Sequence, residues 1–133
     1  MALDNFLNKE VNISKWNKMW DLWVKEEAES PYAEIMTYHS EVNSGGHYGF
    51  FDICDFRSSS DLRIKTVEIL KNALPDVLSE CVSNGYEAYL ALEEGTDDEE
   101  KYEDILAECD DIFSDNESLI EDILAKYAET IEL

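Results

Sequence analysis

Apolar residues recur every three or four positions along most of the chain, a spacing that predicts helices rather than strands. Ser14 is a good helix N-cap, and the apolar stripe after it predicts a helix to about Glu29. The Ser30-Pro31 pair predicts the start of a second helix, which we expect to end at Gly45-Gly46, because glycine favours helix-ending conformations. The stripe of the first helix consists of Trp16, Met19, Trp20, Trp23 and Val24.

The middle of the chain predicts three more helical segments. Residues 47–56 are rich in aromatic side chains and predict a short buried helix. Residues 58–60 are three serines, which predict a loop that ends in a helix cap. A stripe from Leu62 to Leu74 predicts the next helix, and Pro75 marks the start of another.

Two capping boxes occur in the last third of the chain. Thr96 is followed three residues later by Glu99, and Ser114 by Glu117, so each pair predicts a helix start. We therefore expect two antiparallel helices joined by a tight turn. The whole pattern predicts an all-α fold, a single compact bundle of about six to seven helices that forms one domain over residues 1–133.

The composition adds a large negative charge to this picture. The 133 residues include 32 acidic and 10 basic ones, for a net charge of −22, while 44% of the residues are hydrophobic. That apolar content is sufficient for a core and excludes a disordered acidic tail. The shortage of Lys and Arg excludes direct binding of nucleic acid, because neutralising phosphates requires basic side chains.

Cysteine usage and the lack of long apolar runs predict a cytoplasmic protein. Cys54, Cys81 and Cys109 are an odd number without paired spacing, which favours reduced thiols that act as small buried hydrophobic residues. The first ten residues do not resemble a signal peptide, and no segment approaches the roughly 20 apolar residues of a membrane span. We therefore expect no association with membranes.

The acidic residues are concentrated toward the end of the chain. Residues 93–133 hold 17 acidic residues and two basic ones. Like charges three or four positions apart on a helix repel one another, and few lysines relieve that repulsion here. One hypothesis is that the acidic faces only keep the chain soluble, and the other is an interface for a basic partner. The predicted partner-binding surface consists of Glu100, Glu103, Asp104, Glu108, Asp111, Glu121 and Asp122.

The sequence offers no specific signal for catalysis or cofactor binding. Two histidines flank the glycine pair, but neither they nor the cysteines have the spacing of a zinc motif. The acidic stretch 110–122 lacks the ligand pattern and central glycine of an EF-hand. We therefore predict no catalytic residue, no cofactor and no metal site. The residues considered for a metal site are His39, His47, Glu34, Glu41, Asp52 and Cys54.

Residues 41–51 carry the most specific motif of the chain. They resemble the E-x-x-N-G-G-x-x-x-F-F signature of the bacterial DNA-mimic-protein family, with Ser44 at the asparagine position and Gly49 where the family often has glutamine. The resemblance implies an all-helical fold and, for some members, action as an acidic decoy that occupies the DNA-binding surface of a protein. We expect the motif residues to be structural; they are Glu41, Asn43, Gly45, Gly46, Phe50 and Phe51.

The charge and the resemblance together favour a DNA-mimic-like protein that binds a basic DNA- or RNA-binding protein and competes with its nucleic acid. An alternative is an immunity or antitoxin-like protein that neutralises a basic nuclease toxin, which would rely on the same attraction between an acidic surface and a basic protein. A third hypothesis, from another class, is a ligand-binding domain or enzyme with a pocket near Asn43–Asp52. Part of the tryptophan stripe could also form the seam of a homodimer.

Overall fold

The computed structural model describes residues 12–57 and 60–133, together with the side chains outside residues 54–63. Among the residues so described there is no strand, which confirms the predicted all-α class. None of the described helices has both the length and the apolar character needed to cross a bilayer. The helices are α2 (Ile13–Val24), α3 (Tyr32–Arg57), α4 (Ser60–Ala73), α5 (Asp76–Glu94) and α6 (Glu99–Glu129).

These five helices, counted over the described residues, are fewer than the six to seven that the sequence predicts. The main reason is that α6 runs without interruption from Glu99 to Glu129. Ser114 therefore lies inside a helix, and the second predicted capping box is wrong. The apolar positions explain the continuity, because Phe113 and Ile120 are both buried on one side of the helix, before and after the expected turn.

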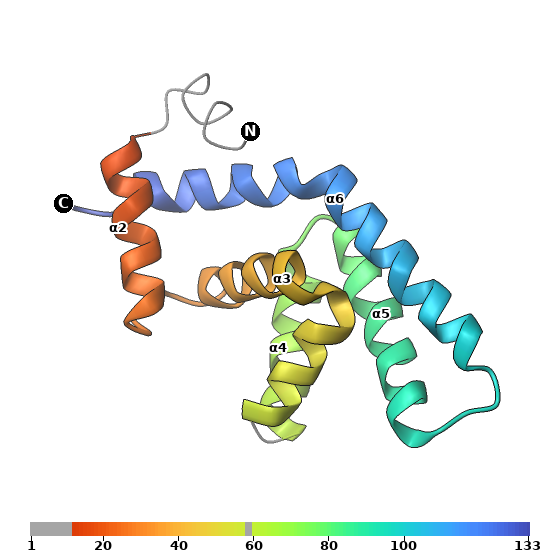
Figure 1. The fold of residues 1–133 in the computed structure, drawn as a ribbon. Coiled ribbons are helices and arrows are strands. Elements are labelled where there is room, and N and C mark those ends of the chain that lie inside the picture. Colours follow the sequence, from red (N-terminus) through yellow and green to blue (C-terminus); the bar gives the residue numbers. More distant parts are fainter. Residues whose placement is uncertain (1–11, 58–59) are drawn as a thin grey trace.

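Instead of ending at the expected turn, α6 bends in its middle part (Figure 1). Near this point the side-chain amide of Asn116 donates a hydrogen bond to the carbonyl oxygen of Ile112 at 2.8 Å. Side chains that bond to the carbonyl four residues back compete with the helix ladder and favour bending. The polar sequence at 114–117 thus marks a bend in one helix rather than a turn between two.

The glycine pair interrupts α3 without ending it. Gly46 has φ 70° and ψ −175°, which is outside the helical region, and the chain is helical again immediately afterwards. The interruption lies where the sequence predicts it, and the predicted aromatic helix follows as the second segment of α3. Of the predicted loop at 58–60, residues 58 and 59 lie outside the described residues, while Ser60 already belongs to α4.

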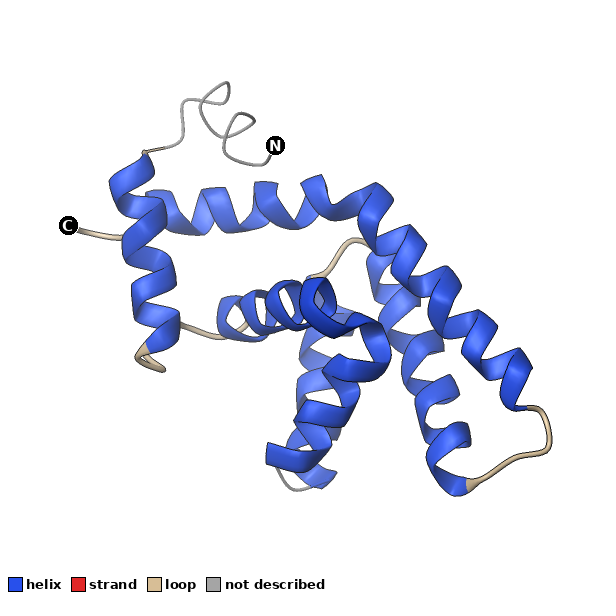
Figure 2. Cartoon of the chain, viewed as in Figure 1, coloured by secondary structure: helices blue, strands red, loops and turns tan. Residues whose placement is uncertain are grey.

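The two longest helices, α3 and α6, determine how the others are arranged. The first half of α6 runs antiparallel to α5, to which residues 95–98 connect it (Figure 1). The second half of α6 reaches α2, where Lys15 Nζ donates to the carbonyl oxygen of Glu129 at 3.1 Å. Helix α4 packs against both α3 and α5. Helix α3 lies in the middle of the view, between α2 and α5 (Figure 1 and Figure 2).

All five helices contribute to one hydrophobic core. Trp16, Trp20 and Trp23 are partly buried and pack against it, as predicted for the first stripe, but Val24 at the end of α2 is 70% exposed and does not join them. Cys81 and Cys109 are buried free thiols, also as predicted, while the side chain of Cys54 lies outside the described ones. The most deeply buried large side chains are Met19, Ile35, Met36, Tyr38, Phe50, Phe51, Leu70, Leu78, Tyr89, Ile120 and Leu124.

Two helix starts differ from the predicted ones by a few residues. Asn12, not Ser14, caps α2, because its side-chain oxygen accepts from the backbone N–H of Lys15 at 3.1 Å. Thr96 does not cap α6 as predicted either; its hydroxyl accepts from the N–H of Asp98, just before the helix begins. In α2 the helix starts earlier than predicted because Asn12 supplies the cap, and in α6 it starts later because Thr96 stabilises a turn before the helix.

Candidate functional site

Exposed carboxylates are concentrated on α5, the loop after it and the first half of α6. Residues 76–115 contain fifteen acidic residues and a single basic one, Lys101. All of these acidic residues except Asp110 are exposed. We call the exposed ones the acidic surface; they are Asp76, Glu80, Glu87, Glu93, Glu94, Asp97, Asp98, Glu99, Glu100, Glu103, Asp104, Glu108, Asp111 and Asp115.

Two grooves flank α6, and carboxylates line both of them. The first, of about 270 Å³, lies between α5 and α6, with Glu80, Glu87 and Glu108 among its lining residues beside apolar ones such as Ile105. The second, of about 500 Å³, is lined by the other side of α6 and by Tyr48 of α3, and it includes Glu99, Glu103 and Asp110. The acidic surface is therefore ridged rather than flat, and each groove has room for a side chain of a partner.

Tyr48 adds a fixed polar group to the second groove. Its hydroxyl donates to Glu93 Oε1 at 2.5 Å. This hydrogen bond to a carboxylate raises the pKa of Tyr48 to about 12, so the phenol keeps its proton at neutral pH. The side chain is 41% exposed, so an aromatic ring is available to a partner beside the carboxylates.

The predicted partner-binding residues divide into two groups. The first five are exposed members of the acidic surface, namely Glu100, Glu103, Asp104, Glu108 and Asp111. Glu121 is a correction, because only 6% of it is exposed, and Asp122 is partly buried. Because α6 continues as one helix, Glu121 lies between the buried residues Ile120 and Leu124 on its inner side.

The glycine motif is held by a chain of hydrogen bonds that runs from Asp110, at the edge of a groove, to the buried side chains of His47 and Tyr38. Asp110 Oδ1 accepts from the backbone N–H of His47 at 2.8 Å and from His47 Nδ1 at 2.6 Å. His47 Nε2 lies 2.6 Å from the hydroxyl of Tyr38. A carboxylate only accepts, so Nδ1 carries the imidazole proton and Tyr38 donates to Nε2. Burial lowers the pKa of His47 and raises that of Tyr38, and both groups therefore stay neutral in these roles.

Gly46 is required by this arrangement for two reasons. Its φ of 70° is a left-handed conformation that other residues rarely adopt. In addition, a Cβ at this position would lie 2.6 Å from Asp110 Oδ2, closer than real contacts allow. The absence of a side chain lets Asp110 reach the backbone N–H of His47, the first of the second segment of α3, where a carboxylate also interacts favourably with the helix dipole.

The two phenylalanines of the motif build the core around this chain, whereas Asn43 and Gly45 are exposed and Glu41 is partly exposed. Phe50 and Phe51 are fully buried and contact Tyr38, Tyr86 and Tyr89. Both ring nitrogens of His47 are already engaged, and its side chain is fully buried, so it does not face a ligand. Phe50, Phe51 and His47 thus fill the core rather than line a pocket, whereas Tyr48 of the same segment lies at the surface groove.

The sequence does not predict the structural roles of Asp110 and Glu121, of which only Glu121 is buried. Asp110 is one of many acidic residues in its segment, and its contact with His47 joins positions 63 apart. Glu121 was assigned to the surface for the same reason, since its charge alone does not distinguish an inward from an outward side chain. The only signal for Asp110 is its place directly after Cys109, which the sequence predicts to be buried and which is 4% exposed.

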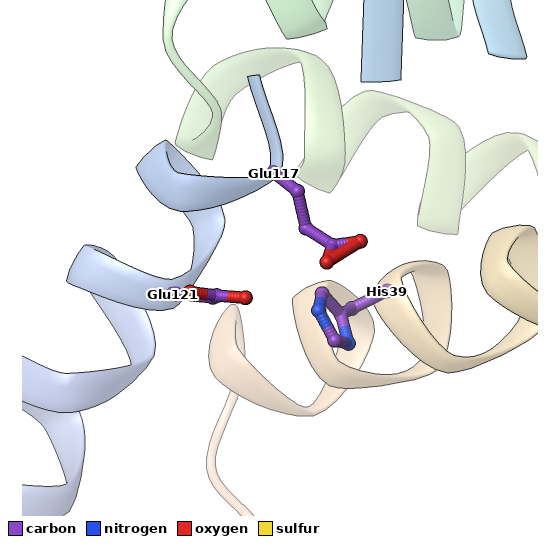
Figure 3. A group of neighbouring side chains, drawn as sticks. All are labelled: His39, Glu117 and Glu121. Carbon is purple, nitrogen blue, oxygen red and sulfur yellow. The ribbon is translucent and has the colours of Figure 1, made fainter. Parts of the chain in front are cut away.

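Three side chains form a group that could hold a metal ion. His39 of α3 faces Glu117 and Glu121 of α6 (Figure 3), and one ligand atom from each lies within 4.8 Å of the others. Of the residues considered for a metal from the sequence, this group contains His39 alone. His47 is engaged elsewhere, and Asp52 is exposed. Glu41 lines a different surface recess, beside Trp23 and Thr37.

No protein-family model matches this chain, and no curated protein or solved structure shows significant similarity to it.

Proposed function

We propose that the protein binds a basic, nucleic-acid-binding protein through the acidic surface and competes with the nucleic acid for it. The observation that carries this proposal is the location of the charge. Residues 76–115 have a net charge of −14, whereas residues 1–75 and 116–133 have −4 each. Solubility does not require such concentration, since charge spread over the whole surface serves it equally well.

The acidic surface is also rigid, which suits competition with a nucleic acid. It is carried by two packed helices, whose inner sides include the buried residues Leu78, Tyr89 and Phe113. Because the backbone that carries the carboxylates is already helical, binding orders only their side chains, so less conformational entropy is lost than on ordering a flexible chain. A disordered acidic tail of the same charge would lack this advantage.

The spacing of the carboxylates imitates part of the field of a nucleic acid. Along α6, Glu100, Asp104, Glu108, Asp111 and Asp115 follow one another at intervals of three or four residues. At 1.5 Å per residue these positions are about 4.5–6 Å apart along the helix axis. Duplex DNA carries one charge per ~1.7 Å of its axis, so the α6 stripe alone is sparser, and the carboxylates of α5 and the loop increase the density.

The two grooves favour lysine or arginine side chains as the inserted groups. Each groove combines carboxylates with apolar floor residues, which match the charged head and the methylene stem of a long basic side chain. The resemblance of residues 41–51 to the DNA-mimic-protein family supports the same function. An immunity protein for a basic nuclease would use this surface too, and the identity of the bound protein distinguishes the two.

Affinity capture tests the proposal. The immobilised chain is exposed to cytosol at about 0.05 M and about 0.5 M salt, and bound proteins are eluted with duplex DNA. We expect basic nucleic-acid-binding proteins that are retained only at low salt and released by DNA. Retention of acidic or neutral proteins, or retention that neither salt nor DNA disturbs, would count against the proposal. Recovery of a nuclease whose activity the chain inhibits would favour the immunity role.

A further inference from the structure

The group formed by His39, Glu117 and Glu121 lies away from the acidic surface, where the second half of α6 meets α3. Glu117 and Glu121 are one helical turn apart on α6, so their side chains project from the same side. Glu121 is only 6% exposed. The same spacing of two ligands on one helix is used by zinc-binding helices.

His39 offers a second, independent observation. Its Nε2 atom is buried and has no hydrogen-bond partner among the described residues. A buried polar nitrogen without a partner destabilises the fold, and a metal–nitrogen bond would offset that cost. The imidazole ring also packs against two aromatic rings, which restrict its orientation. The ring centroids of Trp20 and Phe113 lie 6.1 Å and 6.2 Å from that of His39.

The geometry of the group is close to that of a metal site. The three ligand atoms lie within 4.8 Å of one another. Ligands of a tetrahedral zinc ion, at bond lengths of about 2.0–2.1 Å, are roughly 3.3 Å apart. Rotations of the three side chains that move each ligand atom by about 1 Å would therefore close the site, without a change in the helices.

We propose that His39, Glu117 and Glu121 bind one divalent transition-metal ion, such as zinc, through one imidazole nitrogen and two carboxylates. This donor set suits zinc better than magnesium or calcium, which prefer oxygen ligands alone. Three protein ligands leave a position for water. Because the ligands come from α3 and α6, the bound ion cross-links the two helices and stabilises the fold in proportion to its affinity.

The state of His39 agrees with this role. Burial lowers the pKa of its imidazole, although the nearby Glu117 carboxylate opposes that shift. A neutral imidazole is the form that ligates metals. The high negative charge of the whole chain further favours the arrival of a cation.

Titration calorimetry of the metal-free chain with zinc, in the presence of excess magnesium, tests the proposal. We expect one zinc ion per chain, a melting temperature raised by several degrees at saturating zinc, and visible absorption of a protein-bound complex when cobalt replaces zinc. The variants His39→Gln and Glu117→Gln should each weaken zinc binding by about tenfold or more. The magnesium suppresses binding that needs only negative charge.

The matched control is the pair Glu100→Gln and Asp104→Asn, which removes two carboxylates with the same spacing from the exposed side of the same helix. This control should bind zinc as the unchanged chain does. The proposal is overturned if the control loses as much affinity as His39→Gln, if His39→Gln retains full affinity, or if magnesium abolishes zinc binding. Circular dichroism shows whether each variant remains helical, and Glu117→Gln, at a partly exposed position, serves if His39→Gln unfolds.

Discussion

Asp110 joins the first half of α6 to the glycine pair of α3. It accepts two hydrogen bonds from His47 and occupies the space that the missing side chain of Gly46 provides. The sequence predicts the interruption at the glycine pair, because glycine is distinctive there. It does not predict Asp110, because the partner residue is remote in the chain and many neighbouring residues have the same charge.

Replacing Gly46 with alanine tests this account of the motif. We expect Gly46→Ala to destabilise the fold by about 1–3 kcal/mol, since the φ of 70° becomes strained and the new Cβ displaces Asp110. Gly49→Ala is the control, because it lies in a helix with nothing within 4 Å of the added Cβ, and it should stabilise the fold by up to about 1 kcal/mol. Urea unfolding measures both; equal effects would refute the explanation.

The two histidines predict how stability depends on pH. Burial lowers the pKa of both His39 and His47 below the ordinary value of 6.5, so both are neutral in the fold and take up protons on unfolding once the pH is below that value. The free energy of unfolding should therefore fall as the pH falls from about 7.5 to about 6, a range in which ordinary carboxylates remain ionised.

Urea unfolding at several pH values, in the presence of a chelator, measures this dependence. The variant His39→Gln should show a shallower dependence than the unchanged chain, because one of the two contributing groups is gone. A free energy of unfolding that stays constant or rises on acidification over this range would contradict the assignment of neutral buried imidazoles.

At the scale of elements, the periodicity of apolar residues predicts most helices, and the capping signals predict their ends less well. Both prolines precede helices, as expected, and Gly85 lies within α5. The error at Ser114 arises because a capping box is a local signal, whereas the continuity of α6 depends on contacts with several other helices. A local pattern cannot weigh those contacts, so it predicts a turn where the helix only bends.

The substitution Ser114→Ala distinguishes the two interpretations. Inside a continuous helix, alanine is the better helix former, so the exposed Ser114→Ala should be neutral or stabilise the fold by a few tenths of a kcal/mol. If Ser114 capped a separate helix, the same change would cost about 0.5–2 kcal/mol. Thermal unfolding of the two proteins decides between these outcomes.

At the scale of the whole molecule, carboxylates and buried apolar residues lie on opposite sides of the same helices. The first half of α6 presents Glu100, Asp104 and Glu108 outward while Leu106 and Phe113 are buried. The sequence predicts this division, because carboxylates and apolar residues alternate at helical spacing. Beyond the bend the division fails, and Glu121 turns inward to meet α3, a contact that only the tertiary arrangement defines.

The central claim is that the acidic surface, rather than the negative charge as such, binds the basic partner. Two variants that each lose four charges separate these ideas. One carries Glu100→Gln, Asp104→Asn, Glu108→Gln and Asp111→Asn on the surface. The other carries Glu27→Gln, Glu29→Gln, Asp52→Asn and Glu132→Gln at exposed positions elsewhere.

The decisive measurement is the affinity of both variants for the captured basic protein, at one salt concentration and with the unchanged chain as reference. The account predicts a loss of about tenfold or more for the surface variant, equivalent to about 1.4 kcal/mol, and a change of less than about twofold for the other. Equal losses in the two variants, or no loss in the surface variant, would contradict it.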